Sequence, residues 1–152
     1  NSEIFDTDRL LTIINMNLGN YNYLLDKDYS VNDYPVLTSG DSTTLSYYYN
    51  DLSLYHFYSK NDVENALFFA LKSISYNKNY DYIYYNTAMY YWKGMNDINK
   101  AIAFIKKAIK LNDRLTEAYK ALAEIYNEAG NTDSANHYLN IYYKMDLSDN
   151  GK

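Results

Sequence analysis

The chain has 152 residues and a mass of 17.8 kDa, and 47% of the residues are hydrophobic, which suits one ordinary domain with its own core. The absence of Cys excludes disulfides, thiolate nucleophiles and thiolate metal sites. The net charge of −5 gives no overall attraction to nucleic acid or anionic lipid, and no apolar stretch approaches the roughly 20 residues of a membrane-spanning helix.

The first 43 residues are predicted to form a helical cap or a degenerate repeat. Apolar residues follow a helical spacing over about residues 4–18, and Gly19 marks a turn into a second short helix. Residues 26–43 are polar and contain the single Pro of the chain, so we expect a long loop there.

Three later segments repeat one pattern. The segment 62–67 (DVENAL) matches 97–102 (DINKAI), and 131–135 (NTDSA) matches both. The repeat length is 35 residues from Ala66 to Ala101 and 34 residues from Ala101 to Ala135. The extra residue is assigned to the loop at about residues 77–81, because an insertion in a loop costs little.

Each repeat is predicted to contain two amphipathic helices joined by a short turn. Gly130 is expected to end one helix in a left-handed conformation, with Asn131 or Thr132 capping the next. The repeated pattern and the single Pro predict six helices over about residues 44–147, with one or two more before them. The predicted repeats span about 44–79, 80–114 and 115–147, with a tail over 148–152.

This pattern resembles the tetratricopeptide repeat (TPR), whose signature has Trp, Leu, Gly and Tyr in the first helix and Ala, Phe and Ala in the second. At these places the last repeat has Tyr119, Leu122, Ala123, Tyr126, Ala135, Leu139 and Tyr142. The middle repeat has Tyr85, Ala88, Met89, Trp92, Ala101, Ile105 and Ala108, and the first has Asn50, Ser53, Leu54, Phe57, Ala66, Ala70 and Ser73. The resemblance implies an all-α fold, a right-handed superhelix of three antiparallel helix pairs, with Ala101 where two helices cross.

In the TPR family the first helices of successive pairs line a concave groove that receives a peptide or partner segment. The resemblance places these residues there: Tyr48, Asp51, Tyr55, Tyr58, Asn86, Tyr90, Lys93, Lys120, Glu124 and Asn127. Some members hold a terminal carboxylate with a Lys/Asn clamp. Asp51, Tyr55 and Glu117 stand at three of the clamp positions, and two of them would repel a carboxylate. A carboxylate clamp is therefore rejected.

Signals for catalysis are few. The two histidines, His56 and His137, lie in different repeats without ligand-spaced neighbours, and there is no glycine-rich phosphate loop or nucleophile elbow. The sequence therefore predicts no catalytic residue, no metal and no cofactor.

The charges are unevenly distributed along the chain. Residues 93–120 are basic, whereas residues 1–65 are acidic. The lysines of segment 100–110 form either a patch for an acidic partner or the solvated face of an amphipathic helix, and their helical spacing favours the second interpretation.

Two functions remain. The first is a non-catalytic protein-interaction module that binds a peptide or partner segment in the groove, and the alternative is an assembly protein that self-associates through its repeats. At the C-terminal end, Tyr138, Ile141, Tyr142 and Tyr143 are expected to be partly exposed, which favours a weak homodimer or a covering partner. The chain begins at Asn1, so no localisation is assigned.

Overall fold

The computed structural model describes residues 42–150, and this part of the chain is all helical, with no strand within it. The elements are α3 (Ser42–Tyr58), α4 (Val63–Tyr76), α5 (Asp81–Met89), η1 (Tyr90–Gly94), α6 (Ile98–Leu111), α7 (Thr116–Glu128) and α8 (Thr132–Asn150). The predicted all-α class is confirmed. The cap and loop predicted over residues 1–43 lie outside the described residues except for Ser42 and Thr43, which belong to α3.

Two predicted boundaries need correction. Helix α3 begins at Ser42, two residues before the predicted start of the first repeat. Helix α8 continues to Asn150, so residues 148–150 belong to a helix and not to a tail.

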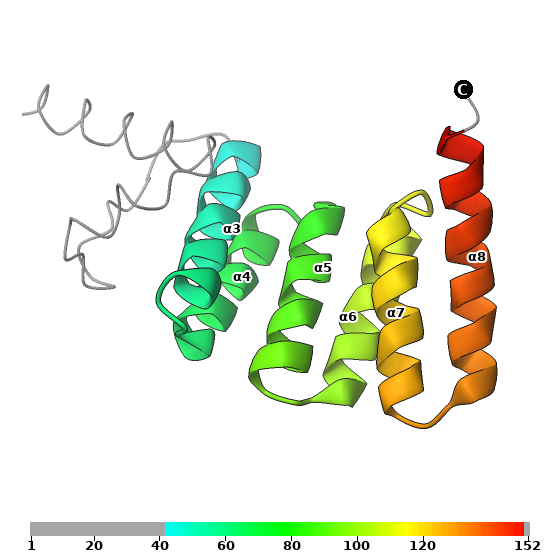
Figure 1. Cartoon of the computed structure of the whole chain (residues 1–152). Helices are drawn as coiled ribbons and strands as arrows, with labels where there is room; N and C mark the ends of the chain where they lie inside the picture. Colours follow the sequence, from blue (N-terminus) through cyan, green and yellow to red (C-terminus); the bar gives the residue numbers. More distant parts are fainter. Residues whose placement is uncertain (1–41, 151–152) are drawn as a thin grey trace, which may run out of the picture.

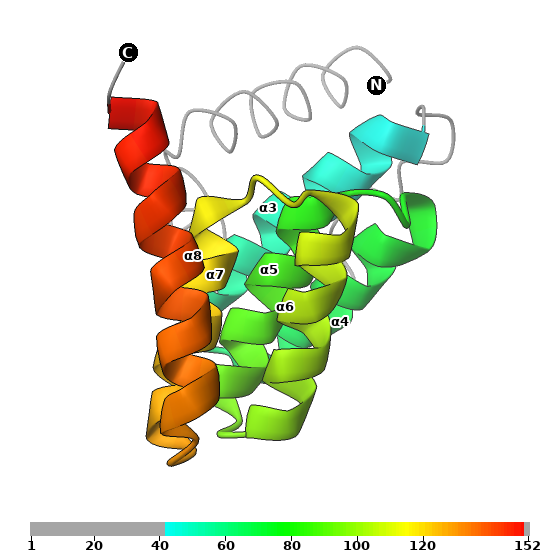
Figure 2. The same ribbon diagram turned by 90° about the vertical axis from the view of Figure 1, so that its right-hand side faces the viewer.

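The helices stand in a row as antiparallel pairs, α3 with α4, α5 with α6 and α7 with α8 (Figure 1). Helices α3, α5 and α7 form one layer, and α4 and α6 form a second layer behind it (Figure 2). Each pair contacts its neighbours along the row, which is the architecture of a helical repeat solenoid. None of the helices between residues 42 and 150 combines the length and the apolar character that a membrane span needs.

The turn inside each pair is built in the same way three times. The side-chain oxygens of Asp62, Asp97 and Asn131 accept hydrogen bonds of 3.0, 3.1 and 3.1 Å from the backbone N–H three residues later, which caps α4, α6 and α8. The residue before each cap has positive φ: Asn61 52°, Asn96 53° and Gly130 75°. The left-handed conformation predicted for Gly130 is confirmed, and Asn131 is the residue that caps the last helix.

The turn between pairs also repeats. Oδ1 of Asn77 and Oδ1 of Asn112 each accept a 3.0 Å hydrogen bond from the backbone N–H two residues on. The hydroxyls of Tyr84 and Tyr119 donate 3.0 Å hydrogen bonds to carbonyl oxygens six residues earlier. Asn77 and Asn112 are 35 residues apart, and so are Tyr84 and Tyr119, so the loop after α4 is as long as the loop after α6.

The extra residue of the middle repeat therefore lies in the helix. Tyr84 and Tyr119 are 35 residues apart, whereas the caps Asp97 and Asn131 are only 34 apart, so α5 with η1 holds one residue more than α7. The backbone absorbs this residue as a π-helical turn. The assignment of the extra residue to the loop at 77–81 is wrong.

Small residues lie where the helices approach most closely. Ala66, Ala101 and Ala108 have no solvent exposure, which agrees with the predicted position of Ala101 at a helix crossing. At Gly94 an added methyl group would overlap Cγ2 of Val63, because η1 ends directly against the start of α4. The core between the pairs is continuous and includes Ile83, Tyr90, Ile105, Leu122 and Ile125, each without exposure.

Candidate functional site

A groove of about 780 Å³ lies on the side of the molecule formed by α3, α5 and α7. It is larger than two other hollows between residues 42 and 150, which have volumes of about 240 and 430 Å³. Side chains from five elements line it: Phe57, Tyr58, Tyr85, Met89, Trp92, Lys93, Thr116, Glu117, Lys120, Ala121, Glu124, Tyr142 and Asp146.

The last helix closes one end of the groove. The C-terminal half of α8 leans toward the layer of α3, α5 and α7 (Figure 2), and Tyr142 and Asp146 of this helix line the groove. The partial exposure predicted for Tyr142 is confirmed, and its side chain lines the groove. No pattern in the sequence indicates this wall, because the tilt of a terminal helix has no local signal.

Aromatic side chains form much of the lining. Phe57 packs with its ring centroid 4.6 Å from that of Tyr90 beneath it. Tyr58 is 67% exposed at the α3 edge, and Tyr85 is half-buried near the middle. Such rings offer a partner large contact areas at low entropic cost.

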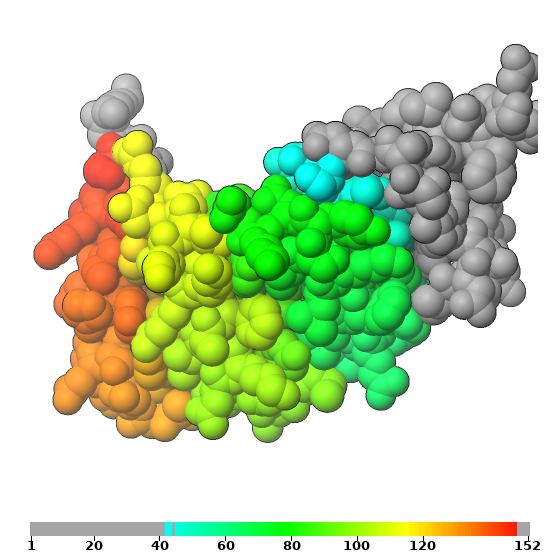
Figure 3. Space-filling model, turned by 180° about the vertical axis from the view of Figure 1, so that it is seen from behind, coloured from blue at the N-terminus to red at the C-terminus, as the bar shows by residue number. Residues whose placement is uncertain are grey.

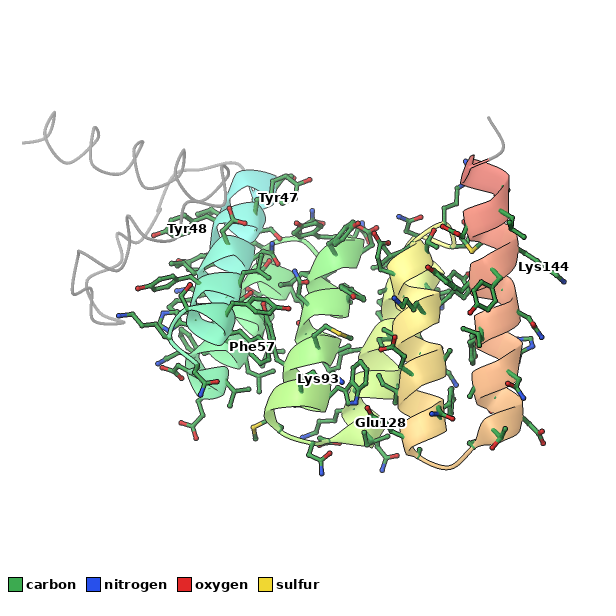
Figure 4. The ribbon with its side chains drawn as sticks, viewed as in Figure 1. Tyr47, Tyr48, Phe57, Lys93, Glu128 and Lys144 are labelled. Atoms are coloured by element: carbon green, nitrogen blue, oxygen red, sulfur yellow. The ribbon has the colours of Figure 1, made fainter. Side chains whose placement is uncertain are left out.

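A hydrogen-bonded cluster joins the second and third helix pairs at the lower edge of the groove. The indole Nε1–H of Trp92 donates a 2.6 Å hydrogen bond to Oε2 of Glu128. Nζ of Lys93 lies 3.7 Å from Oε1 of Glu128 and 3.2 Å from the centroid of the Trp92 ring. Figure 4 shows Lys93 and Glu128 facing one another from η1 and α7.

Carboxylates of α7 influence the tyrosines of α5. Burial raises the pKa of Tyr82, and the charge of Glu117 and a hydrogen bond to its carboxylate raise it further. Burial also raises the pKa of Tyr85, with added contributions from Tyr58, Glu117 and Glu124. Glu117 and Glu124 therefore face the aromatic middle of the groove across the gap between two helix pairs.

Four of the ten predicted groove residues line the groove, namely Tyr58, Lys93, Lys120 and Glu124. Asp51 and Asn86 lie on the same layer but outside the lining. Nδ2 of Asn86 donates a 2.9 Å hydrogen bond to Oδ1 of Asn50, and burial raises the pKa of the Asp51 carboxyl to about 6. Asn127 is exposed on α7 but is likewise not part of the lining.

The predicted exposure of three tyrosines is wrong. Tyr90 is 0% exposed, and its hydroxyl lies 2.9 Å from Oγ of Ser53 in the core. Tyr48 and Tyr55 are 4% and 2% exposed. In Figure 4, Tyr48 leaves α3 on the side away from α5, whereas Phe57 points toward it.

One misplaced residue accounts for the error at Tyr90 and for the position of Asn86 outside the lining. If the extra residue lay in the loop, Asn86 and Tyr90 would correspond to Lys120 and Glu124, a spacing of 34 residues, and Ile83 would correspond to Glu117. Because the extra residue lies in η1, the true spacing before this turn is 35 residues, and the matching side chains are Tyr82, Tyr85 and Met89. Two of these three, Tyr85 and Met89, line the groove.

The opposite face carries the lysines of α6. Figure 3 views this side, where α4, α6 and α8 lie foremost. Lys100, Lys106 and Lys107 are exposed, and each Nζ lies 5.0–5.7 Å from the centroid of a tyrosine ring. This agrees with the solvated helix face that the spacing favoured. Over the described range, no group of three or more His, Asp or Glu side chains is arranged to hold a metal ion.

A scan against models of protein families found no match, and neither did a search of curated protein sequences. Solved structures do match. One described as "Crystal structure of MamA" has a TM-score of 0.79 and 21% identity over 99% of this chain and 87% of that chain. A second, "Crystal structure of MamA protein", has a TM-score of 0.73 and 23% identity over 93% and 72%. At such identities the likeness shows the fold, a helical repeat solenoid.

Proposed function

We propose that this chain is a non-catalytic protein-interaction module of the TPR type, and that it binds a peptide or partner segment in the groove. The observation that carries this proposal is the lining, in which aromatic rings from α3, α5, η1 and α8 surround charged side chains of α7. Solenoids use such concave surfaces to bind extended segments. The volume of about 780 Å³ lies within the usual range for ligand sites.

The test starts from random peptides displayed on phage and selected on the whole chain. Peptides that survive selection are synthesised, and their affinities are measured by calorimetry for the wild type and for Tyr58→Ala. Because Tyr58 is 67% exposed, its truncation leaves the core intact. Loss of an aromatic contact at the binding surface should weaken binding by about 1–2 kcal/mol, roughly tenfold.

The control variant is Phe68→Ala. Phe68 is 51% exposed on α4, an exposed aromatic ring outside the groove lining, so the substitution removes similar apolar surface. Binding should be unchanged. If Phe68→Ala weakens binding and Tyr58→Ala does not, the groove is not the binding surface.

Self-association is a second candidate, and exposed side chains on α8 favour it. Tyr143 is 53% exposed and Leu147 is 73% exposed, near the end of the last helix. Exposed apolar surface of this kind marks association sites. Sedimentation at high protein concentration should then detect a weak dimer that Leu147→Glu abolishes. A monomer at all concentrations contradicts this candidate.

A further inference from the structure

Negatively charged side chains outnumber positively charged ones in the lining of the groove. Three carboxylates (Glu117, Glu124 and Asp146) and two ammonium groups (Lys93 and Lys120) line it. Lys93 is already engaged, because its Nζ lies 3.7 Å from Glu128 and over the Trp92 ring. Its charge is therefore compensated inside the protein. Lys120 is then the one remaining positive charge in the lining to balance three carboxylates.

Lys120 does not neutralise its neighbours through close contacts. Between residues 42 and 150, no ion pair within 4.0 Å includes Lys120. Its Nζ instead lies 5.9 Å from the centroid of Tyr142. Glu117 and Glu124 stand three residues before and four residues after it, so all three lie on one face of α7. Both carboxylates are exposed and keep part of their surface for a ligand.

We infer that the groove selects a basic segment of a partner protein, with a Lys or Arg side chain of that segment held between the carboxylates of Glu117 and Glu124. This inference rests on the proposed function and specifies its ligand. The aliphatic stem of such a side chain packs on Tyr85 and Tyr142 while its charged end reaches the carboxylates.

The same chemistry already exists inside the groove. Lys93 lies 3.2 Å from the centre of the Trp92 indole and close to a carboxylate of α7. The groove can therefore hold a cation over an aromatic ring and next to a carboxylate. An acidic segment, by contrast, would place its carboxylates against Glu117 and Glu124, and this repulsion discriminates against it.

The probe is a short fluorescein-labelled peptide, acetylated and amidated, in which Lys alternates with Leu and Ser. Its twin has Glu in place of every Lys. Fluorescence anisotropy with the whole chain should detect binding of the Lys peptide and none of the Glu twin. Binding should weaken as salt rises, since exposed charges are screened over about 8 Å at physiological ionic strength.

Neutralising the carboxylates tests where the peptide binds. Glu124→Gln should weaken the Lys peptide about fivefold, and the double variant Glu117→Gln/Glu124→Gln should weaken it by about tenfold or more. Glu64→Gln is the matched control, because Glu64 is an exposed carboxylate on α4 outside the groove. Equal losses in Glu64→Gln and Glu124→Gln would show attraction to the net charge only and would overturn the inference.

Two further outcomes separate this inference from the proposed function. If displayed peptides depend on Tyr58 but are acidic or neutral, the basic specificity is wrong and the interaction module stands. If no selected peptide depends on any groove residue, both fail. Spermine can also be added as a competitor at the same concentration of positive charge as the Lys peptide. If it displaces the peptide completely, the groove binds a small polycation, and the inference of a peptide ligand is overturned.

Discussion

The hydroxyl of Tyr90 lies 2.9 Å from Oγ of Ser53, and neither residue has any solvent exposure. Ser53 donates its own proton to the backbone carbonyl of Asn50 at 2.6 Å, so Tyr90 is the donor to Ser53. This contact joins the first turn of η1 to the middle of α3. Tyr90 thus holds two helix pairs together and is not available to a partner.

Truncating Tyr90 should therefore reduce stability. We expect Tyr90→Ala to lower the free energy of unfolding by about 3–5 kcal/mol, because it leaves a cavity in the core. Tyr90→Phe should cost about 1 kcal/mol, the value of one hydrogen bond. Urea unfolding followed by circular dichroism measures both. Tyr58→Ala is the control, and a loss for Tyr90→Ala no larger than that for Tyr58→Ala would contradict the buried position.

Gly94 should tolerate no side chain while Val63 is present. A methyl group there would overlap Cγ2 of Val63, and its Cβ would lie 3.1 Å from Cε2 of Phe57. We expect Gly94→Ala to destabilise the chain by about 1–3 kcal/mol through overpacking. Thermal unfolding measures the loss.

A double-mutant cycle identifies the cause of that loss. Val63→Ala should remove most of the overlap, so Gly94→Ala should cost less in its presence. Gly130→Ala is the comparison: no atom lies within 4 Å of its added Cβ, but its φ of 75° should cost about 1–2 kcal/mol that Val63→Ala does not change. Strict additivity for Gly94→Ala and Val63→Ala would show that the two positions are not in contact.

Ala101→Trp should destabilise severely. Ala101 has no exposure at the crossing of the middle helix pair, and overpacking such a contact costs about 1–3 kcal/mol or more. Ala103→Trp is the matched control two residues away on the exposed side of α6. Melting temperatures should separate the two variants clearly, and similar values would mean that the packing of α6 is different.

Asp51 should reduce stability at neutral pH. Burial raises the pKa of its carboxyl to about 6 in the folded chain, whereas the unfolded carboxyl titrates near its usual value of about 3.9. As pH rises, the unfolded chain releases this proton at a lower pH than the folded chain does. The stability that the protonated Asp51 carboxyl gives the folded chain is therefore present below about pH 4 and is lost as pH rises through 6.

Asp51→Asn isolates this effect. The variant should be more stable than the wild type at pH 7.5 by about 1 kcal/mol, after allowance for partial solvent screening, and the difference should disappear near pH 4. Urea midpoints across this range measure it. His56 should not affect the comparison, because the groups that shift its pKa besides burial are Asp62 and Lys60 and do not include Asp51. A difference that grows toward low pH would have the wrong sign.

Local sequence determined the helices, their caps and their turns. Asp62, Asp97 and Asn131 cap helices by bonding to a backbone N–H three residues away, and Gly130 supplies a left-handed residue at its own position. Such interactions depend on neighbours in the chain, so a repeated pattern identifies them. The burial of Ala66 and Ala101 followed in the same way from helical periodicity.

The tertiary structure alone decided which side chains face the groove. A repeat of 35 residues has the same length whether its extra residue lies in a loop or in a helix. The spacing of Tyr84 and Tyr119 against that of the caps Asp97 and Asn131, together with the π-helical turn, assigns that residue to η1. Tyr90 then packs against Ser53 and Phe57. One added residue turns the face of a helix by about 100°, so Tyr90 is in the core and Met89 faces the groove. Lys93 follows the added residue, and its predicted place in the groove was unaffected.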